Sequence, residues 1–151
     1  MEMEIFYQLF LALILGGLIG LDREIKRKEA GLQTYSLVAM GTCLFTIVAF
    51  KMVDFFGEQS SIVFDPARII QAIAIGIGFV GAGAIFRHGA GVMGLTTAAG
   101  LWVTASIGVA VGVRLYVLSI VTTILALFVL IVLGLLESRV FEKDLKKKNN
   151  N

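Results

Sequence analysis

Residues 115 to 136 read LYVLSIVTTILALFVLIVLGLL, a run of 22 residues without a single Asp, Glu, Lys or Arg. A helix rises 1.5 Å per residue, so a run of this length crosses the roughly 30 Å hydrocarbon core of a bilayer. Four further charge-free runs precede it, at residues 5–21, 30–50, 69–86 and 88–113. Because a soluble helix exposes charged residues every few positions, these runs exclude a water-soluble domain.

The five runs predict an all-α integral membrane protein, a bundle of five transmembrane helices. The predicted spans are about 5–21, 33–53, 67–86, 96–113 and 115–136. They form one membrane domain over residues 1–136, followed by a basic cytoplasmic tail, 137–151. Residues 88–94 are rich in glycine and predict a loop, whereas Asp65 followed by Pro66 is a favoured helix start.

The distribution of lysine and arginine predicts the orientation. If the N-terminus lies outside, 10 of these residues are cytoplasmic and 3 are external, as the positive-inside rule favours. The external ones are Lys51, Arg68 and Arg114. The acidic start of the chain and the absence of a cleavage site after Leu21 indicate that the first run stays as a helix and is not a cleaved signal peptide. We therefore expect the C-terminus in the cytoplasm.

Small residues recur at helical spacing in three of the predicted spans. They are Gly16 and Gly20 in the first, Gly76, Gly78, Gly81 and Gly83 in the third, and Gly100, Thr104, Gly108 and Gly112 in the fourth. Such residues let helix backbones approach closely in lipid, where apolar burial drives association only weakly. Packing within one bundle explains them most simply, and a homo-oligomer contact is the alternative. Both a monomer and a parallel homodimer are compatible with the sequence.

Charged residues gather at the two rims of the bundle and leave its middle neutral. The candidate cytoplasmic-rim cluster comprises Asp22, Arg23, Glu24 and Thr34; the candidate outer-rim cluster comprises Asp65, Arg68 and Gln71; Thr96 and Thr97 are expected to open the fourth helix. A solvated anchoring face is the simpler interpretation of the first cluster, and a helix cap with an interfacial charge that of the second. Asp22 with Lys26 and Glu24 with Lys28 have the spacing of ion pairs on a helix.

Several functional classes are excluded by composition. One cysteine and one histidine leave no thiolate or paired-histidine metal site, so only carboxylate or backbone oxygens could hold a metal. A net charge of +2, dispersed along the chain, does not favour nucleic acid as a partner. No nucleophile, base and orienting acid could converge, so we expect neither an enzyme nor a bound cofactor. The lipid bilayer is the one partner that the composition requires.

Five motifs make the interpretation more specific. In chain order they are GLIGLDRE at 17–24, AGLQTYSLVAMG at 30–41, DPARI at 65–69, GIGFVGAG at 76–83 and GLTTAAGLW at 94–102. In order and spacing they resemble the membrane domain of the MgtC/SapB family, without the soluble C-terminal domain of longer members. Asp22 stands where the family commonly has Glu, and Gln33 and Tyr35 stand where Arg and His are frequent.

The resemblance implies a multi-pass protein of the bacterial inner membrane, linked to growth in low magnesium and, in some pathogens, to virulence. Two functions follow as hypotheses. The first is a regulatory or adaptor protein that contacts a membrane complex, which by family analogy is the ATP synthase. The alternative is a small Mg²⁺ channel or carrier, with Asp22, Glu24 and Asp65 as ion ligands at the rims. No central charge supports a proton relay, which agrees better with the first hypothesis.

Overall fold

Five helices long and apolar enough to cross a membrane make up the computed structural model, which describes residues 2–56, 65, 67–88 and 91–136. They are α1 (Glu2–Ile25), α2 (Leu32–Phe56), α3 (Ala67–Ala84), α4 (Leu95–Gly112) and a fifth that starts as α5 (Tyr116–Phe128) and continues as a π-helical turn, η1 (Val129–Leu133). The prediction of an all-α protein with five spanning helices is confirmed. The predicted tail, 137–151, lies outside the described residues.

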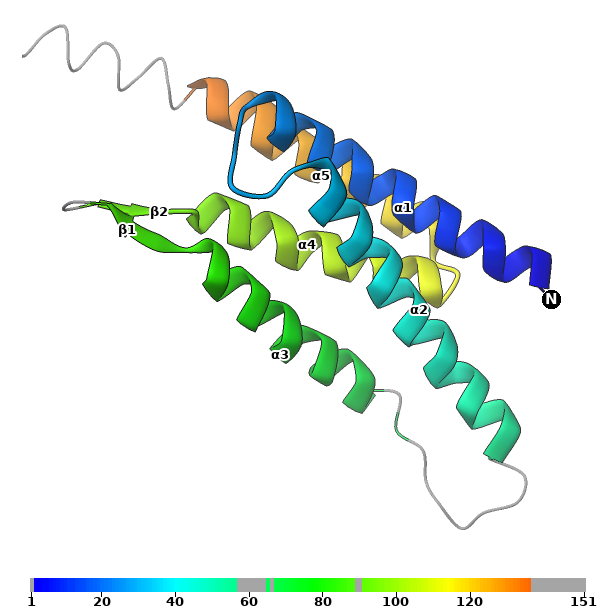
Figure 1. Ribbon diagram of the computed structural model, residues 1–151. Helices are drawn as coiled ribbons and strands as arrows, with labels where there is room; N and C mark the ends of the chain where they lie inside the picture. Colours follow the sequence, from blue (N-terminus) through cyan, green and yellow to red (C-terminus); the bar gives the residue numbers. More distant parts are fainter. Residues whose placement is uncertain (1, 57–64, 66, 89–90, 137–151) are drawn as a thin grey trace, which may run out of the picture.

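Helix α4 is the centre of the bundle and contacts each of the other four helices (Figure 1). In the most apolar part of α4, 44% of the residues are buried. The corresponding share for α3, at the periphery, is 11%. The core lies between α1, α2 and α4, and its largest fully buried apolar side chains include Ile19, Tyr35, Leu101 and Ile107. Side chains on α3 and α5 therefore meet mainly the surroundings of the bundle.

Glycines let α1 lie directly on α2. A Cβ atom at Gly16 would lie 2.5 Å from the carbonyl oxygen of Tyr35, and one at Gly20 would lie 2.8 Å from the Cα of Leu32. Neither position can accept a side chain without moving the α2 backbone. This close contact is the role that small residues have between helices in lipid.

The glycines of α4 form a second close contact with α2, next to the one that α1 makes. A Cβ at Gly100 would lie 2.6 Å from the Tyr35 hydroxyl, one at Gly112 would lie 2.6 Å from the Cβ of Thr46, and one at Gly108 would overlap the Thr42 hydroxyl. Thr104 in the same row is fully buried. Helix α2 thus meets both α1 and α4 at backbone-to-backbone range.

The glycines of α3 do not share this packing role. Gly81 alone approaches another helix, with its Cβ position 3.4 Å from the Cβ of Ala98. Gly76, Gly78 and Gly83 face open space among the described residues, so within one copy these three contact no other helix, and packing on another molecule stays a prediction. The reason is that α3 touches the bundle along one narrow edge, and regular glycine spacing does not reveal which edge that is.

The connection between α3 and α4 also differs from the predicted loop. Two short strands, β1 (Phe86–His88) and β2 (Gly91–Met93), pair antiparallel, with Phe86 opposite Met93. Gly94 then precedes α4 with φ of 86°, a left-handed conformation that glycine adopts without strain. The hairpin extends from the end of the bundle at which α1 ends and α2 begins (Figure 1).

Candidate functional site

The buried Arg23 side chain organises the end of the bundle that the sequence assigns to the cytoplasm. It lies on the last turn of α1 and is only 3% exposed. Its Nη2 donates a 3.4 Å hydrogen bond to the Thr97 hydroxyl on α4. That hydroxyl in turn donates a 2.6 Å hydrogen bond to the carboxylate of Glu29, in the turn between α1 and α2.

This hydrogen bond from Thr97 lowers the pKa of the Glu29 carboxyl below its ordinary value of 4.5, because it stabilises the ionised form. The Lys28 and Arg23 charges act in the same direction. Tyr35, which stands where His is frequent in the family that the sequence resembles, is fully buried and donates from its hydroxyl to the Thr97 backbone carbonyl at 3.1 Å. Thr97 is therefore the common contact of α1, the α1–α2 turn and α2.

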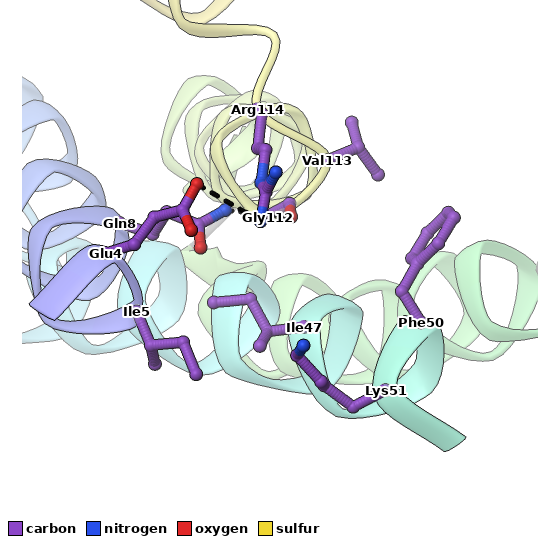
Figure 2. Close-up of a pocket in the computed structure, with 9 residues that line it drawn as sticks. All are labelled: Glu4, Ile5, Gln8, Ile47, Phe50, Lys51, Gly112, Val113 and Arg114. Carbon is purple, nitrogen blue, oxygen red and sulfur yellow. Dashed lines mark hydrogen bonds and ion pairs between the residues drawn. The ribbon is translucent and has the colours of Figure 1, made fainter. Parts of the chain in front are cut away.

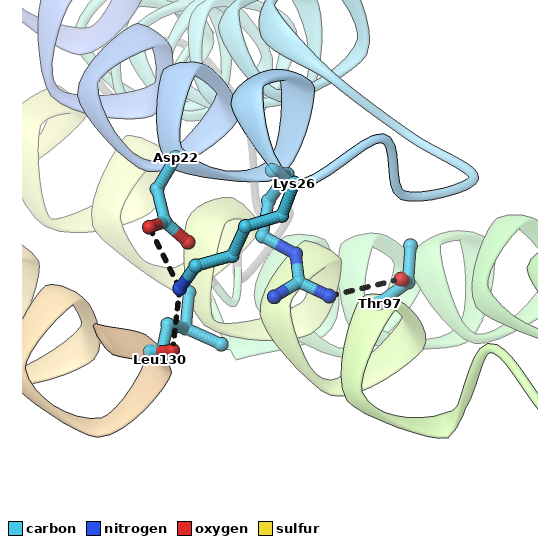
Figure 3. Close-up of polar contacts among 5 residues, drawn as sticks. Asp22, Lys26, Thr97 and Leu130 are labelled. Carbon is cyan, nitrogen blue, oxygen red and sulfur yellow. Dashed lines mark hydrogen bonds and ion pairs between the residues drawn. The ribbon is translucent and has the colours of Figure 1, made fainter. Parts of the chain in front are cut away.

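A second set of contacts joins α1 to the π-helical turn (Figure 3). Asp22 and Lys26 form the expected ion pair at 2.9 Å. Lys26 Nζ also donates a 2.8 Å hydrogen bond to the carbonyl of Leu130 in η1. The second carboxylate oxygen of Asp22 is buried without a hydrogen-bond partner. The pair of charges thus holds the last helix against α1.

The other predicted rim residues have separate positions. The Glu24 carboxylate accepts the backbone N–H of Leu32 at 3.1 Å, and so caps the start of α2. It forms no ion pair with Lys28 in the described part of the chain, because α1 ends at Ile25 and the helical spacing is lost. Thr34 is half-buried on α2, and Thr96 is exposed at the start of α4. Neither joins the contacts around Thr97.

At the opposite end, α1 is attached to the end of α4 by two polar side chains (Figure 2). Gln8 is buried and donates from Nε2 to the carbonyls of Val111 and Gly112, both at 3.0 Å. Glu4 pairs with Arg114 at 3.1 Å. These residues border a cavity of about 300 Å³. No sequence pattern pointed to Gln8 or Glu4, because their partners lie about a hundred residues away.

The predicted outer-rim cluster is not brought together into a site. Asp65 caps α3, with its Oδ1 accepting the Ala67 N–H at 3.0 Å, as the sequence predicts. Arg68 and Gln71 are exposed on α3. No group of three or more His, Cys, Asp or Glu side chains that could hold a metal ion occurs in the described ranges.

The chain is similar in sequence to known proteins of one family. The model of the MgtC family matches residues 9–139. The chain belongs to the MgtC family. It is 39% identical over 145 residues to the Escherichia coli K12 protein named "Putative magnesium transporter YhiD". The aligned region covers 95% of this chain and 67% of YhiD. No solved structure matches the chain.

In two further relatives, the match spans a smaller share of the relative's length. The SapB protein of Bacillus subtilis is 40% identical over 114 residues, or 75% of this chain and 49% of SapB. The MgtC protein of Brucella abortus is 42% identical over 113 residues, or 75% of this chain and 44% of MgtC. Together with the five apolar helices, these relatives identify a multi-pass bacterial membrane protein. None of the three names is that of an enzyme.

Proposed function

We propose that this MgtC-family protein is a regulatory or adaptor protein of the bacterial inner membrane, linked to magnesium limitation or to acid and ion homeostasis. It acts through helix contacts with a membrane partner, while its N-terminus lies outside and its C-terminus in the cytoplasm. By family analogy the ATP synthase is the first complex to test. The observation that carries the proposal is the closed middle of the bundle, where α1, α2 and α4 meet at glycines.

Four hydroxyl groups near this closed region support the same conclusion. Thr42 and Thr46 donate to carbonyls of their own helix, as do Ser119 and Thr123 on α5. Their donors are used within the helix, so these hydroxyls do not form a polar row from one end of the bundle to the other. An ion crossing a single copy would have to separate helices that are in backbone contact.

The three carboxylates suggested as ion ligands have structural contacts of their own. Asp22 pairs with Lys26, Glu24 caps α2 and Asp65 caps α3. In addition, α3 presents large apolar side chains to its surroundings, with Ile75 69% and Phe79 84% exposed. Such a surface suits lipid or a helix of a partner. Transport is the competing function, because the name of YhiD describes a magnesium transporter.

Flux into liposomes tests the proposal directly. Purified protein should leave the permeability to Mg²⁺ and protons equal to that of empty liposomes, whereas inverted membrane vesicles should show altered ATP-driven proton pumping when the protein is present. Flux that persists on purification and falls in Asp22→Asn, but not in the Glu2→Gln control at the far end of α1, would overturn the adaptor function in favour of transport.

A further inference from the structure

A cavity of about 590 Å³ opens between the end of α1, the start of α4 and the end of the last helix. Three basic side chains, Arg23, Lys26 and Lys28, line it together with Thr96. Much of the remaining lining is apolar and comes from the last helix, including Val129, Leu133 and Leu135. The cavity therefore combines positive charge with an apolar wall at one end of the membrane-spanning bundle.

Arg23 is a buried cation, and few of its N–H donors have a hydrogen-bond acceptor. A guanidinium has five N–H donors, yet in the described part of the chain its polar neighbours are two hydroxyls, that of Thr97 at 3.4 Å and that of Tyr35. Its Nε is buried without a partner, and no carboxylate of the described residues lies within 4.0 Å of it. Burying such a charge is costly unless an anion accompanies it. The unmatched donors therefore point to an anionic ligand.

The two lysines of the cavity have different surroundings. Lys26 is occupied by Asp22 and by the Leu130 carbonyl, and Figure 3 shows its side chain directed at both. Lys28 is exposed, and its charge adds to that of Arg23. Arg23 is linked to one acidic group, Glu29, through the Thr97 hydroxyl. The carboxylate of Glu29 already accepts a hydrogen bond from that hydroxyl. A net positive site with a forked donor suits a phosphate group.

We propose that this cavity binds the phosphodiester group of an anionic phospholipid. Arg23 and Lys28 hold the phosphate, and the acyl chains lie along Val129, Leu133 and Leu135. The apolar wall favours a lipid over a free phosphate ion, because basic pockets between spanning helices on the cytoplasmic side recognise lipid headgroups. The inference rests on the cavity and on the predicted orientation, and does not depend on the adaptor function.

Native mass spectrometry of the full chain in neutral detergent tests this site. Phosphatidylglycerol should bind, while phosphatidylcholine of the same acyl chains should bind at least tenfold more weakly. Lys28→Gln should weaken phosphatidylglycerol binding about fivefold, the effect of one basic group near anionic lipid. Arg27→Gln is the matched control: it removes the same charge from an exposed neighbour that does not line the cavity, and should change the affinity less than twofold.

Arg23→Lys provides a second variant, since it keeps the charge but removes the forked donors, and should also weaken binding. If that variant does not fold, the comparison of Lys28→Gln with Arg27→Gln still decides. Equal losses in those two variants would overturn the site in favour of general surface charge. Equal binding of phosphatidylcholine, or full displacement of phosphatidylglycerol by millimolar inorganic phosphate, would also overturn the proposal of an anionic lipid.

Discussion

The Thr97 hydroxyl at the start of α4 donates a 2.6 Å hydrogen bond to the Glu29 carboxylate, 68 residues earlier in the chain. The same oxygen accepts a hydrogen bond from Arg23, and the backbone carbonyl of Thr97 accepts one from Tyr35. One short side chain on α4 thus connects α1 to the turn that follows it. We expect stability at this end of the bundle to depend on that hydroxyl.

Replacing Thr97 by valine keeps the shape of the side chain and removes the hydroxyl. The buried Arg23 then loses its hydrogen bond, and an unsatisfied buried charged group costs about 2 kcal/mol or more. Reversible unfolding in mixed micelles would measure the loss. Thr96→Val at the exposed neighbouring position is the control and should stay within about 0.5 kcal/mol of wild type. Equal effects at both positions would contradict the role given to Thr97.

Acid should weaken the fold in part through Glu29. Its pKa in the folded protein lies below the ordinary value of 4.5, so the carboxylate stabilises the fold above that pH. The contribution is lost as the pH falls through the lower, folded-state pKa. Glu29→Gln should therefore be less stable than wild type at neutral pH and lose less stability on acidification below about 4.5. Unfolding midpoints measured across pH check this, with Glu2→Gln expected to keep the wild-type response.

Substitution of alanine at two glycines should have opposite effects. A Cβ at Gly108 overlaps the Thr42 side chain and the Ala39 carbonyl, so Gly108→Ala should destabilise the bundle by about 1–3 kcal/mol. Gly76 faces open space, and Gly76→Ala should raise stability by up to about 1 kcal/mol through helix propensity. The two changes in unfolding free energy are compared directly. A loss at Gly76 similar to that at Gly108 would indicate a contact made by another molecule.

Gln8→Leu should remove the attachment of α1 to the end of α4. The Gly112 carbonyl would lose a hydrogen-bond donor in a buried position, at an expected cost of about 1–3 kcal/mol. Gln71→Leu changes an exposed glutamine on α3 and should have little effect. The difference in unfolding free energy between the two variants measures the contribution of the Gln8 contacts, and similar values would show that these contacts are dispensable.

The orientation can be tested by labelling introduced cysteines in intact cells. The natural Cys43 is buried and should give a low background. With the N-terminus outside, an impermeant thiol reagent should label Arg68→Cys in intact cells, and Arg27→Cys only after permeabilisation. The reverse pattern would invert the orientation and would place the basic cavity in the outer leaflet.

The charge-free runs were sufficient to predict the five helices, because a span must be both long and uncharged. The exact ends of the helices were harder to predict. Helix α1 extends to Ile25, four residues beyond the predicted span, because Arg23 finds a buried partner on α4. The β1–β2 hairpin was also missed, since glycine-rich stretches are typical of loops and of tight turns alike.

The candidate site was predicted only in part. Asp22, Arg23 and Thr97 were named from the sequence, but as members of two separate groups. Their connection depends on the way α1 crosses α4, and the two elements are 74 residues apart at the Arg23–Thr97 contact. Glu29 and Gln8 gave no signal, because a polar residue near a helix end is ordinary until its distant partner is known.

The central position of α4 has a consequence for how the protein is made. Helices α1 and α2 can pair as soon as both have entered the bilayer, but the residues of α2 that pack on α4 stay uncovered until α4 arrives. Insertion of α3 contributes little to this step, since it packs mainly on α4 itself. During synthesis the chain must therefore keep an incomplete helix pair in the membrane while about forty more residues are inserted, and its compact core closes only when the fourth helix leaves the insertion machinery.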